Sequence, residues 1–221
     1  MERVVPKVVF NIFGLPIRDT VVSTWIAMVL IVGAAIIVGR RRPIVLEILV
    51  HFLNDTVSDV MGRPARPYLP LLGTLAIFIS ITNIIGILPV LNAPTRDINT
   101  PLALALVVFA SVHYFGIRSQ GLVGYLKDLA SPIFLLPLEI VSQISRTLSL
   151  AVRLFGNIIS GELIVAVIFS LAPLFVPLPL TGFSILTGIL QAYIFTALAA
   201  VYTGAALKAR ETKSSESSES G

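Results

Sequence analysis

The sequence has no cysteine and few charged residues, and both absences limit what the protein can be. Without cysteine, disulfides and thiolate metal sites are excluded. Of the 221 residues, 13% are charged and 56% are hydrophobic, whereas a soluble domain usually carries about 25% charged residues. The mean hydropathy is +0.94. This composition indicates an integral membrane protein rather than a soluble one.

Other signals of common function classes are also missing. The two histidines, His51 and His113, do not have the spacing of metal ligands. No glycine-rich phosphate loop with its lysine occurs, so nucleotide binding by that device is excluded. The net charge is +4, but the basic residues lie at the ends of apolar runs, which favours membrane orientation over nucleic-acid binding. We expect no cofactor and no metal. We also expect no cleavable signal peptide, because no A-x-A-like cleavage site follows Lys7.

Five apolar segments are long enough to cross a bilayer, which takes roughly 20 residues. The segment 43–62 differs, because its apolar residues recur at helical spacing while Glu47, Asn54 and Asp55 occupy other faces. This pattern predicts an amphipathic helix on the membrane surface, although a short soluble helix in a loop fits it too. We therefore predict an all-α membrane protein with about five membrane helices and one surface helix. The membrane segments are 21–38, 68–91, 101–117, 132–171 and 177–207. A loop with Arg118, Lys127 and Asp128 is expected after the third segment.

The last two segments are too long to stand upright in a membrane. At 1.5 Å per residue, about 40 and 31 residues measure about 60 and 46 Å, against a hydrocarbon core of about 30 Å. We therefore predict a long, steeply tilted helical hairpin, whose shape suggests a surface fitted to a partner. Residues 1–207 form a single membrane domain in this prediction. The tail 208–221, rich in serine, glutamate and lysine, is expected to be disordered.

Five spans place the two termini on opposite sides of the membrane. The positive-inside bias then puts the N-terminus outside and the C-terminus in the cytoplasm. The basic residues assigned to the cytoplasm are Arg40, Arg41, Arg42, Arg63, Arg66, Arg118, Lys127, Lys208 and Arg210. Those left outside are Arg3, Lys7, Arg18 and Arg96.

Charged residues inside the segment 132–171 are the strongest functional signal, since a charge at the bilayer centre costs about 2.5–3.5 kcal/mol on insertion scales. Arg153 lies mid-segment between apolar residues, so we expect a function for it, whereas Arg146 either has a function or snorkels to the interface. Because arginine does not deprotonate in proteins, Arg153 cannot carry a proton. It can present a fixed charge to a carboxylate that arrives and leaves, an attraction of roughly 4 kcal/mol at about 4 Å and an effective dielectric near 20.

Small and polar residues gather on the helix face of Arg153 when the segment is drawn at about 100° per residue. Such a stripe lets another helix slide close against it. Glu162 falls on the opposite side, so a static salt bridge between Arg153 and Glu162 is not expected, and the acid is expected to line an aqueous cavity. The stripe around Arg153 consists of Ser142, Arg146, Ser149, Gly156, Asn157 and Ser160.

In the last segment, Ser184 and Gln191 share a face. Gln191 fits an interhelical hydrogen bond as well as a functional role. The hydroxyls of Ser184 and Thr187 are more simply explained by hydrogen bonds to their own backbone.

The run RLFGN at 153–157, followed by Gly161 and Glu162, closely resembles subunit a of F-type ATP synthases. Further motifs follow in order and extend the resemblance over about residues 46–206. They are NIIGILP at 83–89, PTRDIN at 94–99, ALAL at 103–106 and QAYIF at 191–195, with Tyr202 after them. The RLFGN block is highly specific, and the other motifs are moderately so.

The resemblance implies an ion-translocating stator subunit that is not an enzyme by itself. Arg153 would face the ion-binding carboxylates of a rotating c-ring, and protons or sodium ions would enter by one half-channel and leave by the other. The implied partners are the c-ring, the b-type subunits of a peripheral stalk and the lipid bilayer. The other residues that the resemblance associates with ion translocation are Glu162, Asn157, Gln191, Glu139 and Asp97. Of these, Asp97 matches an acidic residue in the loop at 92–100, which would face the outside.

Ser184 departs from part of the family pattern. Some bacterial relatives have a histidine at this place, paired with the acid at the position of Glu162. A direct Glu–His relay is therefore excluded here, and waters or hydroxyls such as that of Ser184 are expected to complete the path. The resemblance in this region is to chloroplast and cyanobacterial forms, so a bacterial plasma membrane or a thylakoid fits. Proton and sodium both stay open.

Two other function classes compete with the stator. A self-contained secondary transporter would show internal repeats and a substrate site at the midplane, and no convincing repeat is present. An intramembrane enzyme would need a nucleophile–base pair or a cluster of metal ligands, and the sequence offers neither. The stator is therefore the leading prediction, with the transporter as the alternative.

Overall fold

The computed structural model describes residues 8–12, 15–86, 93–129, 134, 136–171 and 177–219. Over this part of the chain it forms α-helices, one short 3-10 helix and a β-hairpin. The prediction of an all-α membrane protein is confirmed, and the hairpin is a small addition to it. Its strands, β1 (Val8–Ile12) and β2 (Leu15–Arg18), pair antiparallel, and their β-branched residues favour that conformation.

Two helices follow the hairpin. α1 (Asp19–Arg41) contains the first predicted span, and α2 (Pro43–Met61) matches the segment predicted as an amphipathic helix. Pro43 stands in the first turn of α2, where its missing N–H has no intrahelical partner to lose. Gly62 ends the helix with a φ of 66°, a left-handed conformation that glycine adopts without strain. The helix is confirmed, and its place on a membrane surface stays a prediction.

The second and third predicted spans correspond to α3 (Leu69–Ile85) and α4 (Asn99–Gln120). α3 has 17 residues and is shorter than the predicted segment, whose residues 87–91 lie outside the described part of the chain. The 3-10 helix η1 (Pro94–Arg96) leads into α4. The segment after α4 was predicted as a loop, and this is wrong: it contains the short helix α5 (Leu122–Leu129), because Tyr125 is buried against α4.

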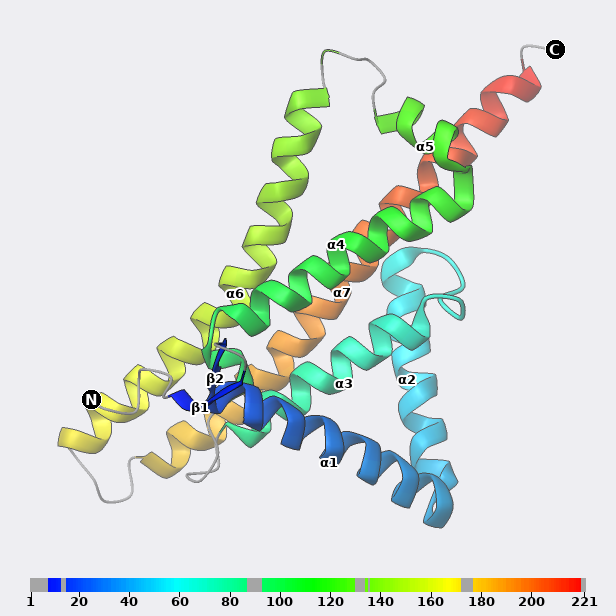
Figure 1. The fold of residues 1–221 in the computed structure, drawn as a ribbon. Coiled ribbons are helices and arrows are strands. Elements are labelled where there is room, and N and C mark those ends of the chain that lie inside the picture. The colour runs from blue at the N-terminus through cyan, green and yellow to red at the C-terminus, as the bar shows by residue number, and fades with distance from the viewer. Residues whose placement is uncertain are drawn as a thin grey trace.

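The last two helices form a hairpin. α6 (Leu136–Leu171) has 36 residues and α7 (Pro177–Glu219) has 43, so each is longer than an upright span requires. Figure 1 shows the end of α6 near the start of α7, while the N-terminal half of α6 leans away from α7. α7 continues into residues 208–219, for which a disordered tail is predicted. The tilt of α6 and α7 in a bilayer stays a prediction.

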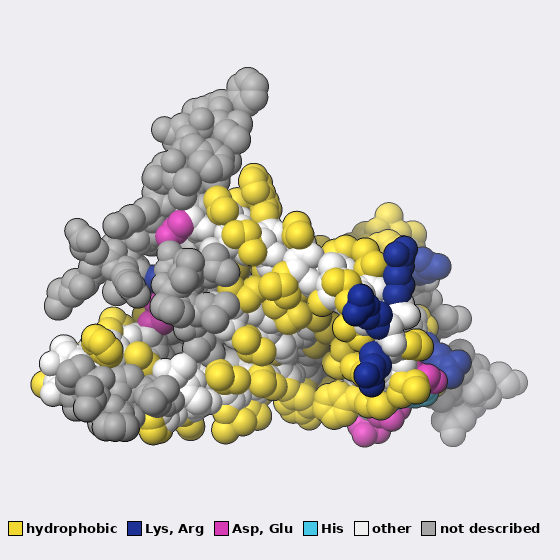
Figure 2. Space-filling view, turned by 90° about the horizontal axis from the view of Figure 1, so that it is seen from below, with side chains coloured by type: hydrophobic (Ala, Val, Ile, Leu, Met, Phe, Trp, Pro, Cys, Tyr) yellow, Lys and Arg dark blue, Asp and Glu magenta, His cyan; other side chains and the backbone are white. Residues whose placement is uncertain are grey.

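Among the described residues, four helices are long and apolar enough to cross a membrane, namely α1, α4, α6 and α7, and α3 is a shorter apolar helix. The core lies along α7, which contacts α2, α3, α4 and α6. Phe195 of α7, Ile79 of α3 and Leu154 of α6 are fully buried there. Figure 2 shows hydrophobic side chains spread over the face that it presents, with basic side chains gathered at one end. The chain is an integral membrane protein.

Candidate functional site

Arg153 lies in the middle of α6 on a face that the rest of the chain leaves open. Its side chain is exposed, whereas Leu150, Ala151 and Leu154 are buried in the core that α6 shares with α4 and α7. Gly156 also has open space before it, because a Cβ added there would meet no atom within 4 Å. The structure therefore presents Arg153 outward from the helix bundle.

The other residues of the predicted stripe are accessible as well. Arg146, Ser149 and Ser160 are exposed, and Ser142, Gly156 and Asn157 are half-buried. The guanidinium carbon of Arg146 lies 5.6 Å from the centroid of the Tyr202 ring on α7, which is within the range of a cation–π contact. The stripe thus forms a surface of small and polar side chains, along which one of the two arginines rests on an aromatic ring.

Asn157 connects α6 to α7, where Ser184 and Thr187 bond to their own helix. The Asn157 amide nitrogen donates to the Thr187 carbonyl at 3.4 Å. The Ser184 hydroxyl donates to the Leu180 carbonyl at 3.0 Å, and the Thr187 hydroxyl donates to the Ser184 carbonyl at 3.1 Å. The prediction that these two hydroxyls bond to their own backbone is therefore confirmed. Ser184 also faces α6, since a Cβ added to Gly161 would lie 3.8 Å from its Oγ.

Gln191 and Glu139 lie in different surroundings. Gln191 is buried on α7, and its amide nitrogen has no hydrogen-bond acceptor among the described residues. Glu139 is half-buried near the N-terminal end of α6 and accepts a hydrogen bond from the amide of Gln143 at 3.1 Å. Glu139 therefore lies near one end of α6, apart from the middle of the helix where Arg153 lies.

Glu162 forms an ion pair with Arg96, a residue that the sequence analysis assigned only to an outer loop. Its Oε2 atom lies 3.1 Å from Nε of Arg96. In some relatives, a basic partner for the acid at this position is expected at the place of Ser184, on α7. The structure supplies that partner from η1 instead, and the pair does not involve Arg153.

Hydrogen bonds tie η1 to two membrane helices. The Thr95 hydroxyl donates to Oδ1 of Asn83 on α3 at 3.1 Å. The Asn83 amide nitrogen in turn donates to the Gly188 carbonyl of α7 at 2.9 Å. Asn83 and Thr95 both belong to motifs that carry the family resemblance, yet neither was singled out, because an amide and a hydroxyl near a turn are common in loops. Asn83 and Thr95 differ from ordinary loop residues in that both are buried in the structure.

Asp97, predicted as an acid in a loop that faces the outside, is buried next to Arg96 in the chain. It accepts a hydrogen bond from the Thr20 hydroxyl of α1 at 3.4 Å and another from the Asn99 backbone N–H at 3.2 Å. The second bond holds the start of α4, and the first connects the turn to α1. The structure therefore brings Asp97, Arg96 and Glu162 to one region of the protein.

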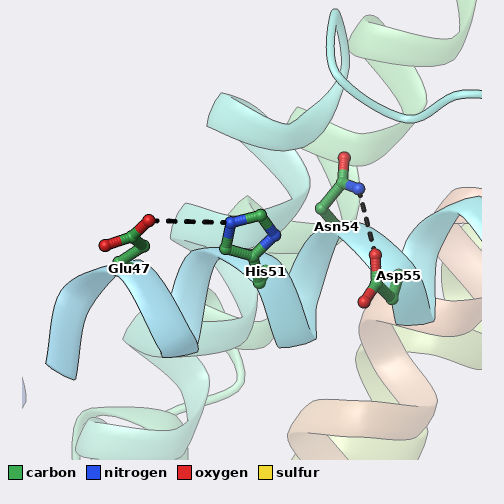
Figure 3. Close-up of polar contacts among 4 residues, drawn as sticks. All are labelled: Glu47, His51, Asn54 and Asp55. Atoms are coloured by element: carbon green, nitrogen blue, oxygen red, sulfur yellow. Dashed lines mark hydrogen bonds and ion pairs between the residues drawn. The ribbon is translucent and has the colours of Figure 1, made fainter. Parts of the chain in front are cut away.

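The two histidines lie apart from this region. Figure 3 shows His51 on α2, where its Nε2 lies 4.0 Å from Glu47 Oε1, near a hydrogen bond of 3.3 Å from Asn54 to Asp55. Both members of the first pair are 70% exposed. His113 places Nδ1 2.8 Å from a carbonyl of its own helix. In the part of the chain that the structure describes, no group of three acidic or histidine side chains could hold a metal.

Comparison with known proteins identifies the family that this chain resembles. A family model described as ATP synthase A chain matches residues 21–204. ATP synthase subunit a 2 of a Bradyrhizobium species is 50% identical over 206 residues, which cover 90% of this chain and 92% of the relative. ATP synthase subunit a of Albidiferax ferrireducens is 41% identical over 209 residues, with 90% of both chains covered. ATP synthase subunit a 2 of a Picosynechococcus species is 41% identical over 213 residues, covering 92% of this chain and 91% of the relative.

The family model matches nearly the whole membrane part of the chain, including η1 and the segment from Arg153 to Glu162. The relatives are matched over nearly their whole lengths, so the likeness is not limited to one motif. The helices long enough to cross a membrane are the expected framework for such a subunit. The chain therefore belongs to the ATP synthase A chain family.

Proposed function

We propose that this chain is the ion-translocating stator subunit of a rotary F-type ATP synthase. It provides two half-channels, and Arg153 faces the ion-binding carboxylates of a rotating c-ring. The observation that carries the proposal is the position of Arg153, which is exposed in the middle of a membrane helix on a face left open by its own chain. A charge at that depth costs about 2.5–3.5 kcal/mol, and a carboxylate from a partner helix offsets this cost.

The fixed charge of Arg153 explains how a ring carboxylate loses its ion. At about 4 Å and an effective dielectric near 20, the attraction between the two charges is roughly 4 kcal/mol. This attraction favours the ionised carboxylate, so the proton or sodium ion leaves into a half-channel. The same charge repels a cation that would pass straight through. Serine and glycine beside Arg153 allow the ring helix to approach closely.

The half-channels lie on either side of this barrier. Each elementary charge that crosses gains about 2.3 kcal/mol per 100 mV of membrane potential, and the separation of the two paths makes that energy available for rotation. Glu162 supports the proposal because its side chain is 29% exposed and carries a carboxylate although it lies on a membrane helix. The residues that we assign to ion translocation with Arg153 are Glu162, Asn157, Gln191, Glu139, Ser184 and Asp97.

The stator function implies particular partners and a particular membrane. The stripe around Arg153 contacts the c-ring, b-type subunits of a peripheral stalk hold the chain still, and lipid covers the remaining apolar faces. The chain contributes no nucleotide site and no catalytic group. We place it in an energy-coupling membrane, a bacterial plasma membrane or a thylakoid, with the N-terminus outside. The exposed arginines 40–42 at the end of α1 support this orientation.

ATP-driven ion pumping in vesicles that contain the whole complex tests the proposal. We expect Arg153→Ala to abolish coupled pumping while the complex still assembles. Arg118→Ala is the control, because Arg118 is near the end of α4 and, among the described residues, bonds to the Tyr114 hydroxyl of its own helix at 3.1 Å. Separate runs with sodium and with a protonophore identify the ion. Undiminished pumping by Arg153→Ala would show that the arginine is structural and would overturn the mechanism.

A further inference from the structure

Arg96 and Glu162 are covered to very different extents. The Arg96 side chain is 6% exposed, whereas the Glu162 side chain is 29% exposed. The arginine is therefore enclosed by protein, while part of the Glu162 side chain stays accessible from outside the protein. A salt bridge that served only to join α6 to η1 would have no need of this access.

Several buried contacts fix Arg96 in its place. Its backbone N–H donates to the Ala93 carbonyl at 3.0 Å, and the preceding Thr95 is fully buried and bonded to Asn83 at 3.1 Å. Gly86 allows the chain to return this closely, because a Cβ on it would collide with Ala93. The backbone of η1 is thus anchored, and the charge of Arg96 is brought to Glu162 in a defined position.

A fixed cation at this distance acts on whatever binds the carboxylate. Arginine keeps its proton in proteins, so the charge on Arg96 is permanent. It favours the ionised form of Glu162 and opposes a proton or metal cation that binds to the same group. When Glu162 is neutralised, this attraction is lost, so the charge on Arg96 favours release of the bound ion.

We propose that Arg96 is the fixed counter-charge of an ion-binding carboxylate in a half-channel: it positions Glu162 and returns it to the ionised form after each ion has passed. This inference rests on the proposed function, because it requires Glu162 to lie on the ion path. Arg96 is a positioning residue in this role and carries no ion itself.

The transfer step needs only hydronium and water. A hydronium in the channel gives its proton to one carboxylate oxygen of Glu162 and becomes water, and the neutral acid no longer forms an ion pair with Arg96. The new O–H bond then breaks, the proton passes to the next water, which becomes a hydronium, and the re-formed carboxylate pairs with Arg96 again. A sodium ion would be bound and released with no covalent bond made or broken. In both cases Arg96 prevents the acid from trapping the ion.

The test compares ATP-driven pumping per assembled complex among variants in vesicles. Glu162→Gln and Arg96→Gln are each expected to pump roughly tenfold more slowly than wild type or worse. Arg96→Lys places another cation beside the Glu162 carboxylate and is expected to stay within roughly threefold of wild type. Arg118→Gln removes an arginine outside the site and is expected to pump at the wild-type rate.

The outcomes separate this inference from the proposed function. Normal pumping by Glu162→Gln removes the acid from the ion path and overturns this inference, while the stator function, which Arg153→Ala tests, is left standing. Slow pumping by Glu162→Gln together with normal pumping by Arg96→Gln overturns the counter-charge role alone. If Arg96→Gln does not assemble, Arg96→Lys decides: a rate within roughly threefold of wild type supports the proposal, and a slower rate or failed assembly overturns it.

Discussion

Asn83 of α3 and Gly188 of α7 hold their two helices together by a hydrogen bond and a close approach. The Asn83 amide nitrogen donates to the Gly188 carbonyl at 2.9 Å, and a Cβ added to Gly188 would lie 3.0 Å from the Asn83 Cβ. Because Asn83 also accepts a bond from Thr95, this contact determines where η1 and Arg96 lie. The position of the ion pair therefore depends on how closely α3 approaches α7.

We predict that Gly188→Val separates α3 from α7 and weakens both stability and pumping. Added carbon atoms have no room next to Asn83, and overpacking of this kind typically costs about 1–3 kcal/mol. The measurement is the temperature at which the solubilised complex loses this chain, together with the pumping rate in vesicles. Gly182→Val is the matched control, since a Cβ at Gly182 would meet nothing within 4 Å. Equal behaviour of the two variants would contradict the close contact.

We predict that Asn83→Leu and Thr95→Val lower stability through a shared hydrogen bond. Asn83→Leu leaves the buried Thr95 hydroxyl and the Gly188 carbonyl without this amide, at a cost of about 1–3 kcal/mol. Thr95→Val removes the other partner of the same bond. In the double variant the loss should be smaller than the sum of the two single losses, because one interaction is removed twice. The same solubilised-complex assay measures it, and strict additivity would mean that the two side chains do not interact.

The helices were predictable because apolar runs of bilayer length have few alternatives to forming helices in lipid. For this reason the segments around Arg153 and Gln191, which form α6 and α7, could be predicted as helices from their own residues alone. Helix α5 was missed, since an eight-residue helix has too short a pattern and forms only because Tyr125 is buried against α4. The β-hairpin is equally short and carried no signal strong enough to separate it from a loop.

The two halves of the candidate site differed in how far the sequence could predict them. Arg153 was found because a charge among apolar residues of a membrane segment is costly wherever its neighbours lie. Arg96 was missed as the partner of Glu162, because the pairing joins segments far apart in the chain and depends on the fold. Within its own segment Arg96 lies two residues after Pro94 and next to Asp97. This pattern is typical of an ordinary polar turn. Periodicity describes one helix at a time and cannot reveal such a contact.

We predict that Gly62→Ala destabilises the turn that follows α2. Gly62 has a φ of 66° and an added Cβ would meet nothing within 4 Å, so backbone strain is the only penalty. That strain is expected to cost about 1 kcal/mol. Gly33→Ala within α1 is the control, because it also has free space and stands in a helix, where alanine is favoured over glycine. The temperature at which the solubilised complex loses this chain should fall only for Gly62→Ala. An unchanged temperature would show that the turn rearranges freely.

We predict that truncation after Arg210 leaves assembly and pumping close to wild type, whereas truncation after Thr203 abolishes assembly. Leu207 is 3% exposed, and the Ala206 carbonyl accepts a hydrogen bond from the Gln120 amide at 3.2 Å. The longer truncation removes these contacts and leaves the end of α4 without its partner on α7, whereas the shorter one removes only serine, threonine, lysine, glutamate and glycine from the polar end. Membrane content of the chain and the pumping rate in vesicles measure both effects. Loss of assembly on truncation after Arg210 would show that the polar end itself binds another subunit.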